Sequence, residues 1–246
     1  MDLKGKTAVV TGATGSAALA VVRSLLEDSA QVALVDADAL RLDSLIRFLR
    51  GTTIGIPCDS ADAGAVRQAH GQIEKLLGPV DILVNAADST SAAKLEATDV
   101  AEWRRVISAN VDGAFNWSRA VLPGMRQREW GRIVNVLSQA AKNPGADTGP
   151  AYAASHGALA SLTFALAREV APHGITVNAV AASCVESSAA IEQLNEAQRR
   201  QLLTQIPVAR FCKPEEFAHA VRFLVSPLAG YVTGEILDVN GGLVMD

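Results

Sequence analysis

The chain has 246 residues, of which 49% are hydrophobic and 20% are charged, so it can bury a substantial core, and extensive disorder is not expected. Its 22 basic and 26 acidic residues give a net charge of −4, which argues against nucleic acid as the main partner. Aromatic residues make up only 4%, a composition that favours helices packed on a buried parallel sheet over an all-β sandwich.

The sequence carries no targeting, membrane or metal pattern. The opening MDLKGKTAVV leads directly into a strand-like run, without the apolar core and cleavage site of a signal peptide. No uncharged apolar run reaches the roughly 18–20 residues that a membrane span needs. Cys58, Cys184 and Cys212 are far apart and odd in number, and the four histidines form no HExxH pair. We expect a cytoplasmic protein without a metal site and without nucleic-acid or membrane partners.

Short β-rich runs alternate with helical patterns along the whole chain. The predicted strands are residues 7–11, 31–36, 52–57, 80–85, 132–137, 175–180 and 235–239. The predicted helices are residues 17–26, 39–50, 61–77, 100–127, 151–170 and 214–226, the fourth being bent near Gly113 and Pro123. This alternation predicts one α/β domain over residues 1–246, a doubly wound Rossmann fold with a parallel seven-stranded sheet and helices on both faces.

The end of the first predicted strand has the pattern of a nucleotide-binding turn. In TGATGSAA, Gly12 and Gly15 permit a tight turn, the following helix directs free N–H groups at a pyrophosphate, and Ala18 stands where a third glycine often allows close packing. Asp36 ends the second strand, where a carboxylate can bind both ribose hydroxyls of an adenosine and repel a 2′-phosphate. Alone, the glycines also fit an ordinary turn and Asp36 a helix N-cap. Together they favour a dinucleotide site that prefers NAD to NADP.

A series of motifs follows in order along the chain. They are TGATG at 11–15, Asp36, CDSAD at 58–62, LVNAA at 83–87, Asn110 in SANVDGAF, IVNVLS at 133–138, YAASH at 152–156, ITVNAV at 175–180 and YVTGEILDVNGG at 231–242. With these motifs the chain resembles the short-chain dehydrogenase/reductase family over essentially its full length. The last motif and the run ARFCKPEEFAHAVRFL at 209–224 are especially similar to the family's bacterial reductases of the 3-oxoacyl type.

The resemblance implies that several strand ends hold a nicotinamide dinucleotide. It assigns the adenine contact to Asp59, the adenosine contact to Asn85 and the nicotinamide carboxamide to the segment with Val185 and Ser187. The whole expected set is Gly12, Thr14, Gly15, Ser16, Ala17, Asp36, Asp59, Ser60, Asn85, Ala86, Ala87, Tyr152, His156, Val185 and Ser187. The residue types also allow ordinary roles, because Asp59 can cap a helix and Asn85 can simply end a strand.

Carbonyl reduction needs a hydride donor and an acid that protonates the developing alkoxide. Tyr152 begins an Ala-rich helix after a loop rich in Pro and Gly, where a phenol can face a pocket. Ser138 follows the fifth strand and can hydrogen-bond the same oxygen, although a lone Ser at a strand end is usually a cap. Asn110 lies in the long helix and can hold a water in a proton relay. The resemblance implies that Tyr152 is the catalytic acid/base and that Ser138 and Asn110 assist it.

The fourth catalytic position departs from the family pattern. His156 stands four residues after Tyr152, on the same helix face, where the family has a Lys that binds the nicotinamide ribose and lowers the pKa of the Tyr. An imidazole has a reference pKa of about 6.5 and is mostly uncharged at neutral pH. A histidine here can bond a ribose hydroxyl or act as a proton carrier, and the sequence leaves both roles open.

Other departures surround the same region. Ser16 and Ala18 replace glycines of one version of the family's turn, Asp88 replaces the Gly of the NNAG motif, and Ala182-Ser183 replaces a Pro-Gly pair. We expect an NAD(H)-dependent oxidoreductase acting on a carbonyl or secondary alcohol substrate. One alternative is a non-catalytic NAD-binding member, a pseudoenzyme or hetero-oligomer partner. The other is a cofactor-independent lyase resembling the haloalcohol dehalogenases, against which the retained Asp36 argues.

Residues 187–210 are polar and irregular, with a helical piece, and are expected to form a substrate lid. The apolar residues of this segment are Ile191, Leu194, Leu202, Leu203 and Ile206, and their spacing is typical of an amphipathic cover, which closes a core more often than it recognises a substrate. Members of the resembled family are usually dimers or tetramers that pair the long helix and the Tyr helix. The small residues of YAASHGALASLTFALA permit such packing, so we expect a homodimer or homotetramer.

Overall fold

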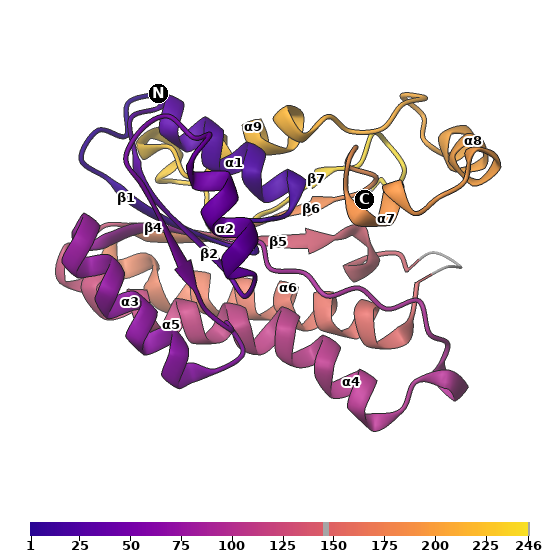
Figure 1. The fold of residues 1–246 in the computed structure, drawn as a ribbon, viewed down its shortest axis with the longest axis horizontal. Helices are drawn as coiled ribbons and strands as arrows, with labels where there is room; N and C mark the ends of the chain where they lie inside the picture. Colours follow the sequence, from indigo (N-terminus) through magenta and orange to yellow (C-terminus); the bar gives the residue numbers. More distant parts are fainter. Residues whose placement is uncertain (145–147, 246) are drawn as a thin grey trace.

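The computed structural model describes residues 1–144 and 148–245. These residues form one seven-stranded parallel sheet with helices on both faces (Figure 1), which confirms the predicted doubly wound α/β fold. The order across the sheet is β3-β2-β1-β4-β5-β6-β7. The strands are β1 (Thr7–Thr11), β2 (Gln31–Asp36), β3 (Thr53–Pro57), β4 (Val80–Asn85), β5 (Gly131–Ser138), β6 (Ile175–Ala182) and β7 (Ile236–Val239).

The helices form two layers, one on each face of the sheet (Figure 1). One layer consists of α1 (Ser16–Glu27), α2 (Ala39–Ile46) and α9 (Pro214–Leu224). The other consists of α3 (Ala63–Leu77), α4 (Val100–Ile107), α5 (Gly113–Gln127) and α6 (Pro150–Val170). Each layer covers its own core: Val10 of β1 packs on the α1 and α9 side, whereas Val9 packs on the α3 and α5 side. Continuous apolar strands such as TAVVT are what a sheet buried on both faces requires.

The order of the strands creates a crevice at the carboxyl ends of β1 and β4. From β1 the chain runs outward to β3 and then returns to place β4 on the other side of β1, and ligands bind at such a switch point. The loops after these two strands approach very closely. Gly12 has φ +60°, and a Cβ there would lie 2.6 Å from the Cα of Ala87. Only glycine fits this position, so Gly12 sets how tightly the crevice closes at its base.

The predicted long helix over residues 100–127 is interrupted. The structure has α4, a π-helical turn at Ser108–Asp112, and then α5, so the irregularity precedes the predicted bend near Gly113. The predicted helix over residues 39–50 ends earlier, at Ile46. Phe48 beyond it is 84% exposed, so packing of this side chain would not stabilise a further helical turn.

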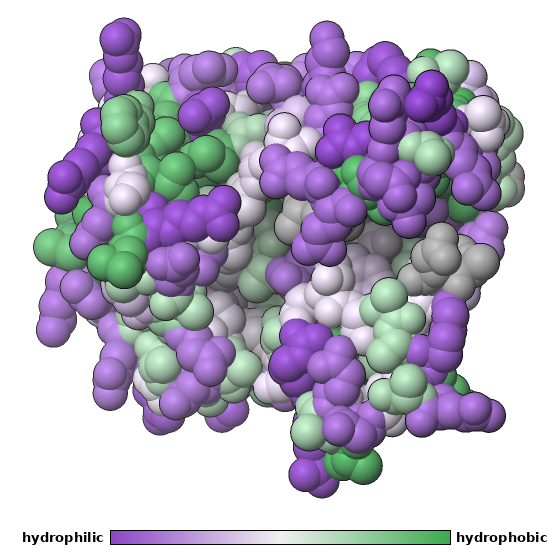
Figure 2. All heavy atoms as spheres, turned by 45° about the vertical axis from the view of Figure 1, so that its right-hand side comes forward, coloured by the Kyte–Doolittle hydropathy of each residue, from purple (hydrophilic) through white to green (hydrophobic). Residues whose placement is uncertain are grey.

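The segment 187–210 contains two helices, α7 (Ala189–Glu192) and α8 (Glu196–Gln205), which lie beyond the carboxyl ends of the central strands in Figure 1. Ile191 and Ile206 are buried, and Asn195 caps α8 in a reciprocal capping box with Gln198. Seen from this side, the molecule is hollowed between this segment and the strand-end loops (Figure 2). None of the helices in the described ranges is long and apolar enough to cross a bilayer.

Candidate active site

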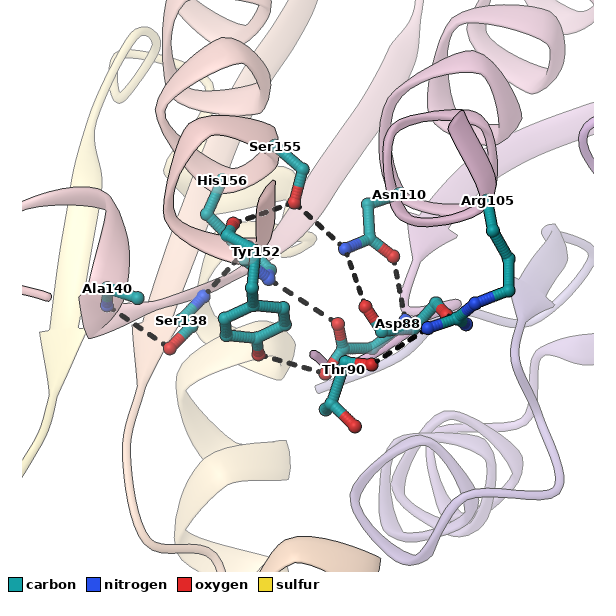
Figure 3. Close-up of polar contacts among 10 residues, drawn as sticks. Asp88, Thr90, Arg105, Asn110, Ser138, Ala140, Tyr152, Ser155 and His156 are labelled. Carbon is teal, nitrogen blue, oxygen red and sulfur yellow. Dashed lines mark hydrogen bonds and ion pairs between the residues drawn. The ribbon is translucent and has the colours of Figure 1, made fainter. Parts of the chain in front are cut away.

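Four side chains converge beyond the ends of β4 and β5 (Figure 3). Tyr152 lies in the first turn of α6, which begins at Pro150, and His156 follows one turn later on the same face. Ser138 is the last residue of β5. The structure therefore brings together three of the predicted catalytic residues. It adds Asp88 from the loop after β4, which the sequence marks only as a departure from the family motif.

The Asp88 carboxylate bridges the two ionisable side chains of α6. The Tyr152 Oη donates a hydrogen bond to Asp88 Oδ2 at 3.1 Å, and His156 Nε2 lies 3.4 Å from Asp88 Oδ1. The rings of Tyr152 and His156 meet edge to face, with centroids 4.3 Å apart. The phenol proton is therefore committed to Asp88 in this conformation (Figure 3).

His156 is buried, with 3% of its side chain exposed, and its two ring nitrogens have different surroundings. The Ser138 backbone N–H donates to His156 Nδ1 at 3.1 Å, so Nδ1 must be unprotonated. In the neutral ring the proton is then on Nε2, which faces Asp88. A cationic imidazolium would point an Nδ1–H at the Ser138 N–H. The backbone therefore holds His156 as a neutral donor, and it does not replace the positive charge of a Lys.

The environment of Tyr152 strongly favours the protonated phenol. Burial is the largest effect that raises its pKa above the ordinary value, and the charge and hydrogen bond of Asp88 raise it further. A side-chain hydrogen bond with Ser138 acts in the opposite direction. The Ser138 hydroxyl oxygen also accepts a hydrogen bond from the Ala140 N–H at 3.1 Å and caps a short 3-10 turn. The capping role and the predicted contact with Tyr152 thus coexist.

Asn110 lies within the π-helical turn and is 2% exposed. Its Oδ1 accepts from the Ser89 N–H at 2.7 Å, and its Nδ2 donates to the Ser89 carbonyl at 3.1 Å and to Ser155 Oγ at 2.9 Å. Ser155 in turn donates to the Tyr152 carbonyl at 2.8 Å. Asn110 therefore clamps the loop that carries Asp88 to the first turn of α6 (Figure 3). Its predicted role as a water holder stays a prediction.

The N-terminus of α1 has features that suit a pyrophosphate. Gly15 is the N-cap and supplies no side-chain hydrogen bond, so the first N–H groups of the helix are left without a capping oxygen. The Ser16 hydroxyl is buried without a hydrogen-bond partner. A Cβ on Gly15 would meet only the Gly12 carbonyl oxygen, at 3.4 Å, so space is open above the turn. Uncapped donors and an unpaired buried hydroxyl beside open space fit a bound diphosphate.

Asp36 connects the end of β2 to this turn. Its Oδ2 accepts from both the N–H and the hydroxyl of Thr14, at 3.1 and 2.8 Å, and its Oδ1 accepts from the Asp38 N–H. The N-cap of α2 is Asp38, so the helix-cap alternative for Asp36 is wrong. A carboxylate has about four acceptor positions, so Asp36 retains capacity for ribose hydroxyls while it orders the glycine turn.

Several other predicted cofactor residues use their side chains within the protein. Asn85 donates to Asn135 at 2.8 Å, and Ser60 Oγ accepts from the indole N–H of Trp117 at 3.1 Å. Asp59 is exposed and accepts from the Ala61 N–H, whereas Asp62 caps α3. For these three residues the side-chain roles seen here are structural.

The remaining predicted contacts are backbone or packing positions. The N–H groups of Ala86 and Ala87 both donate to the Thr11 hydroxyl, which holds the floor of the crevice. Ala17, in the first turn of α1, packs against the core on that side of the sheet. After β6, Val185 is buried and Ser187 is exposed with φ +58°. Within residues 1–144 and 148–245, Val185 and Ser187 share no hydrogen bond with Tyr152, and their predicted carboxamide contact stays a prediction.

A family model described as enoyl-(acyl carrier protein) reductase matches residues 12–244. The chain belongs to the short-chain dehydrogenase/reductase family. This confirms the resemblance inferred from the motifs, and with it an NAD(P)-dependent class of oxidoreductase. The match spans both the nucleotide end and the Tyr152 end of the crevice.

Relatives of this dehydrogenase/reductase chain match it from end to end. The chain is 36% identical to a 3-oxoacyl-(acyl-carrier-protein) reductase of Vibrio cholerae over 245 residues, covering 100% of both chains. It is 37% identical to a protein of the same name from Pseudomonas aeruginosa, again over the whole of both chains. The crystal structure of a 3-oxoacyl-(acyl-carrier protein) reductase from Brucella melitensis superposes with a TM-score of 0.91 at 31% identity, covering 99% of this chain and 92% of that one.

Proposed function

We propose that this chain is an NAD(H)-dependent oxidoreductase that interconverts a carbonyl compound and a secondary alcohol, with Tyr152 as the acid/base. The observation that carries the proposal is the half-buried Tyr152 phenol at the strand-end crevice, within reach of Ser138 and bonded to a proton acceptor. A phenol held in this way can give its proton to a developing alkoxide or take a proton from an alcohol.

The residues around the crevice support a dinucleotide. Gly12, Gly15 and Ser16 would hold the diphosphate, and Asp36 would bind the adenosine ribose. When bound, the nicotinamide supplies or takes up a hydride. A 2′-phosphate beside Asp36 would meet a carboxylate of the same charge, which supports NAD over NADP as the preferred cofactor.

Ser138 and Asn110 have supporting roles in this proposal. Ser138 shares a hydrogen bond with the Tyr152 phenol and can bond the substrate oxygen at the same point. Asn110 fixes the loop after β4 and, through Ser155, the start of α6. These contacts preorganise the phenol, so less reorganisation is needed when the alkoxide forms.

The substrate class to test first follows from the relatives, whose names describe reduction of a 3-oxoacyl group on acyl carrier protein. A cavity of about 300 Å³ next to the end of β6 has a mixed lining, in which Arg210, Glu216 and Asp238 stand beside apolar side chains. It is lined by Cys184, Ile206, Val208 and Phe211, among others. Residues 187–210 supply part of this lining, which supports their role as a lid.

A homodimer or homotetramer is part of the same proposal. Phe115 of α5 and Phe164 of α6 are about half exposed, and both lie on the helix layer that the resemblance pairs across subunits. Large exposed aromatic side chains are typical of an association surface. Sedimentation velocity tests this assembly directly, and a monomer at micromolar concentration would contradict it.

The second candidate is a non-catalytic NAD-binding member, and one observation favours it. The Tyr152 proton is bonded to Asp88, and the neutral His156 supplies no positive charge to stabilise a phenolate. Titration of NADH fluorescence followed by a carbonyl and alcohol panel separates the candidates. NADH binding with hydride transfer supports the oxidoreductase. Binding without transfer by any panel member supports the non-catalytic member, and an absence of binding contradicts both.

A further inference from the structure

The loop after β4 is held in place from several directions. Asn110 bonds both backbone groups of Ser89, and Arg105 of α4 donates to the Ser89 hydroxyl and, at 3.2 Å, to the Thr90 carbonyl. Arg105 is itself paired with Glu102. Asp88 immediately precedes this clamped segment, so its carboxylate approaches α6 from a fixed backbone (Figure 3).

Both oxygens of Asp88 face α6, and each has a distinct partner. Oδ2 accepts the Tyr152 phenol at 3.1 Å, and Oδ1 lies 3.4 Å from His156 Nε2. Because the Ser138 N–H occupies Nδ1, His156 can direct only its Nε2–H towards the carboxylate. His156 is 3% exposed and its Nε2 makes no hydrogen bond among the described residues, so the Asp88 carboxylate at 3.4 Å is the acceptor nearest to hand, whereas the Asp88 side chain is 40% exposed. The partly exposed Asp88 carboxylate thus offers the proton of the half-buried Tyr152 phenol a route to solvent.

We propose that Asp88 is a catalytic residue that exchanges the Tyr152 proton during turnover, and that His156 is the positioning residue that orients its carboxylate. This inference rests on the proposed oxidoreductase function. Asp88 contacts the proton that the reaction moves, which justifies the catalytic role. Because the carboxylate takes the Tyr152 proton as the alcohol proton arrives, no cationic side chain is needed to stabilise a free phenolate.

The relay balances without a free phenolate. In the oxidising direction the alcohol carbon gives a hydride, with its electron pair, to an oxidised nicotinamide dinucleotide. The alcohol hydroxyl proton passes to Tyr152 Oη as the Tyr152 proton passes to Asp88 Oδ2. The products are a carbonyl compound, a reduced dinucleotide and a protonated Asp88, which then releases its proton to solvent. Reduction is the reverse sequence.

The pairing of Asp88 with Tyr152 can be tested without cofactor or substrate, because the chain has only two tyrosines. Tyr231 is fully exposed, so it is an internal reference, and Tyr231→Phe assigns the two signals of protein labelled with ¹³C at tyrosine Cζ. We expect the Tyr152 signal to shift in acid as Asp88 takes up a proton, while the Tyr231 signal stays constant. We expect this acid step to disappear in Asp88→Asn.

The titratable groups in contact with Asp88 are Tyr152 and His156 from α6, and Arg105 bonds the neighbouring Ser89 and Thr90. If the acid step persists in Asp88→Asn, it belongs to another of these groups and the proposal is overturned. Asp43→Asn is the matched control, since Asp43 is exposed on α2 and its side chain makes no hydrogen bond or ion pair within the described part of the chain. It should leave the acid step unchanged. Asp88→Glu, which keeps the carboxyl group, should retain the step if the longer side chain reaches the phenol, and it guards against a folding defect in Asp88→Asn.

A kinetic arm separates a relay from a mere hydrogen bond. With NADH affinity unchanged, Asp88→Asn should lower turnover by about 10²-fold, the contribution typical of a general acid/base, and Asp88→Glu should recover part of it. Turnover equal to the wild type in Asp88→Asn overturns the relay. If the wild-type protein transfers no hydride, the proposed function fails, and the labelled-tyrosine titration alone then decides whether Asp88 holds the Tyr152 proton.

Discussion

Introducing a positive charge at position 156 tests whether Asp88 would neutralise that charge before it could act on Tyr152. A Lys at 156 would bring an ammonium group towards Asp88, whose carboxylate lies 3.4 Å from His156 Nε2. The new charge would therefore pair with Asp88 before it acted on Tyr152. We expect His156→Lys alone to change alcohol oxidation at neutral pH by less than about tenfold, since one pKa unit corresponds to a factor of ten.

Removing the carboxylate at the same time frees the new charge. An opposite charge within about 4–6 Å lowers the pKa of an acid by about 1–3 units. In the Asp88→Gly background, His156→Lys should therefore raise alcohol oxidation at pH 7–8 by at least about tenfold, because more of Tyr152 is ionised. The cost is stability: the buried Ser138 N–H loses its acceptor, which costs about 1–3 kcal/mol in unfolding free energy.

Steady-state oxidation of an alcohol at several pH values, with saturating NAD, measures this cycle of variants. The matched control is His156→Gln in the same Asp88→Gly background, since Gln can still accept from the Ser138 N–H but carries no charge. The reasoning is refuted if the Gln and Lys variants are equally active, or if Lys gives no gain over Asp88→Gly alone.

Three further predictions follow from the contacts described above. The protein should bind NADH at least about tenfold more tightly than NADPH, and Asp36→Asn should narrow the difference, as measured by fluorescence titration; tighter NADPH binding would contradict the role of Asp36. Tyr152→Phe should lower turnover by at least about 10²-fold with little change in NADH affinity, and near-full activity would place the chemistry elsewhere. Burial raises the pKa of Asp28, but Arg222 and the N-terminal ammonium outweigh it and hold that pKa below its usual value. The resulting stabilisation of the fold is present above the carboxyl pKa of the unfolded chain, near 4, and is lost as pH falls through the lowered pKa of the folded protein. Arg222→Gln should therefore lower the free energy of unfolding by about 1–3 kcal/mol at pH 7 and by little near pH 2, as measured by thermal unfolding.

The sequence pattern was sufficient for most of the fold because its signals are local. The apolar runs TAVVT and VDILVN match β1 and β4 residue for residue, and the gap between Gly12 and Asp36 fits one strand–helix–strand unit. The sequence does not predict the π-helical turn at Ser108–Asp112. Hydrogen bonds hold the Asn110 side chain of this turn to Ser89 and Ser155, which are 21 and 45 residues away in the sequence. No periodicity records such distant partners.

The sequence points to the residues of the candidate site but not to the hydrogen bonds among them. The ordered motifs identified Tyr152, Ser138 and His156, and they marked Asp88 as a departure from a glycine. That Asp88 accepts the Tyr152 proton depends on an approach across 64 residues of chain. That His156 is neutral depends on the Ser138 backbone N–H, which has no side-chain signature in the sequence. Both facts emerge only when the strand ends are placed side by side.

The most direct measurement of the central claim is the transfer of deuterium from NADH deuterated at both C4 positions to a 3-oxoacyl ester, followed by mass spectrometry of the alcohol product. We expect the wild-type protein to form a product that carries one deuterium on the carbinol carbon. Tyr152→Phe should form this product at least about 10²-fold more slowly. Deuterium-free product, or labelled product formed equally fast without the Tyr152 hydroxyl, would contradict it.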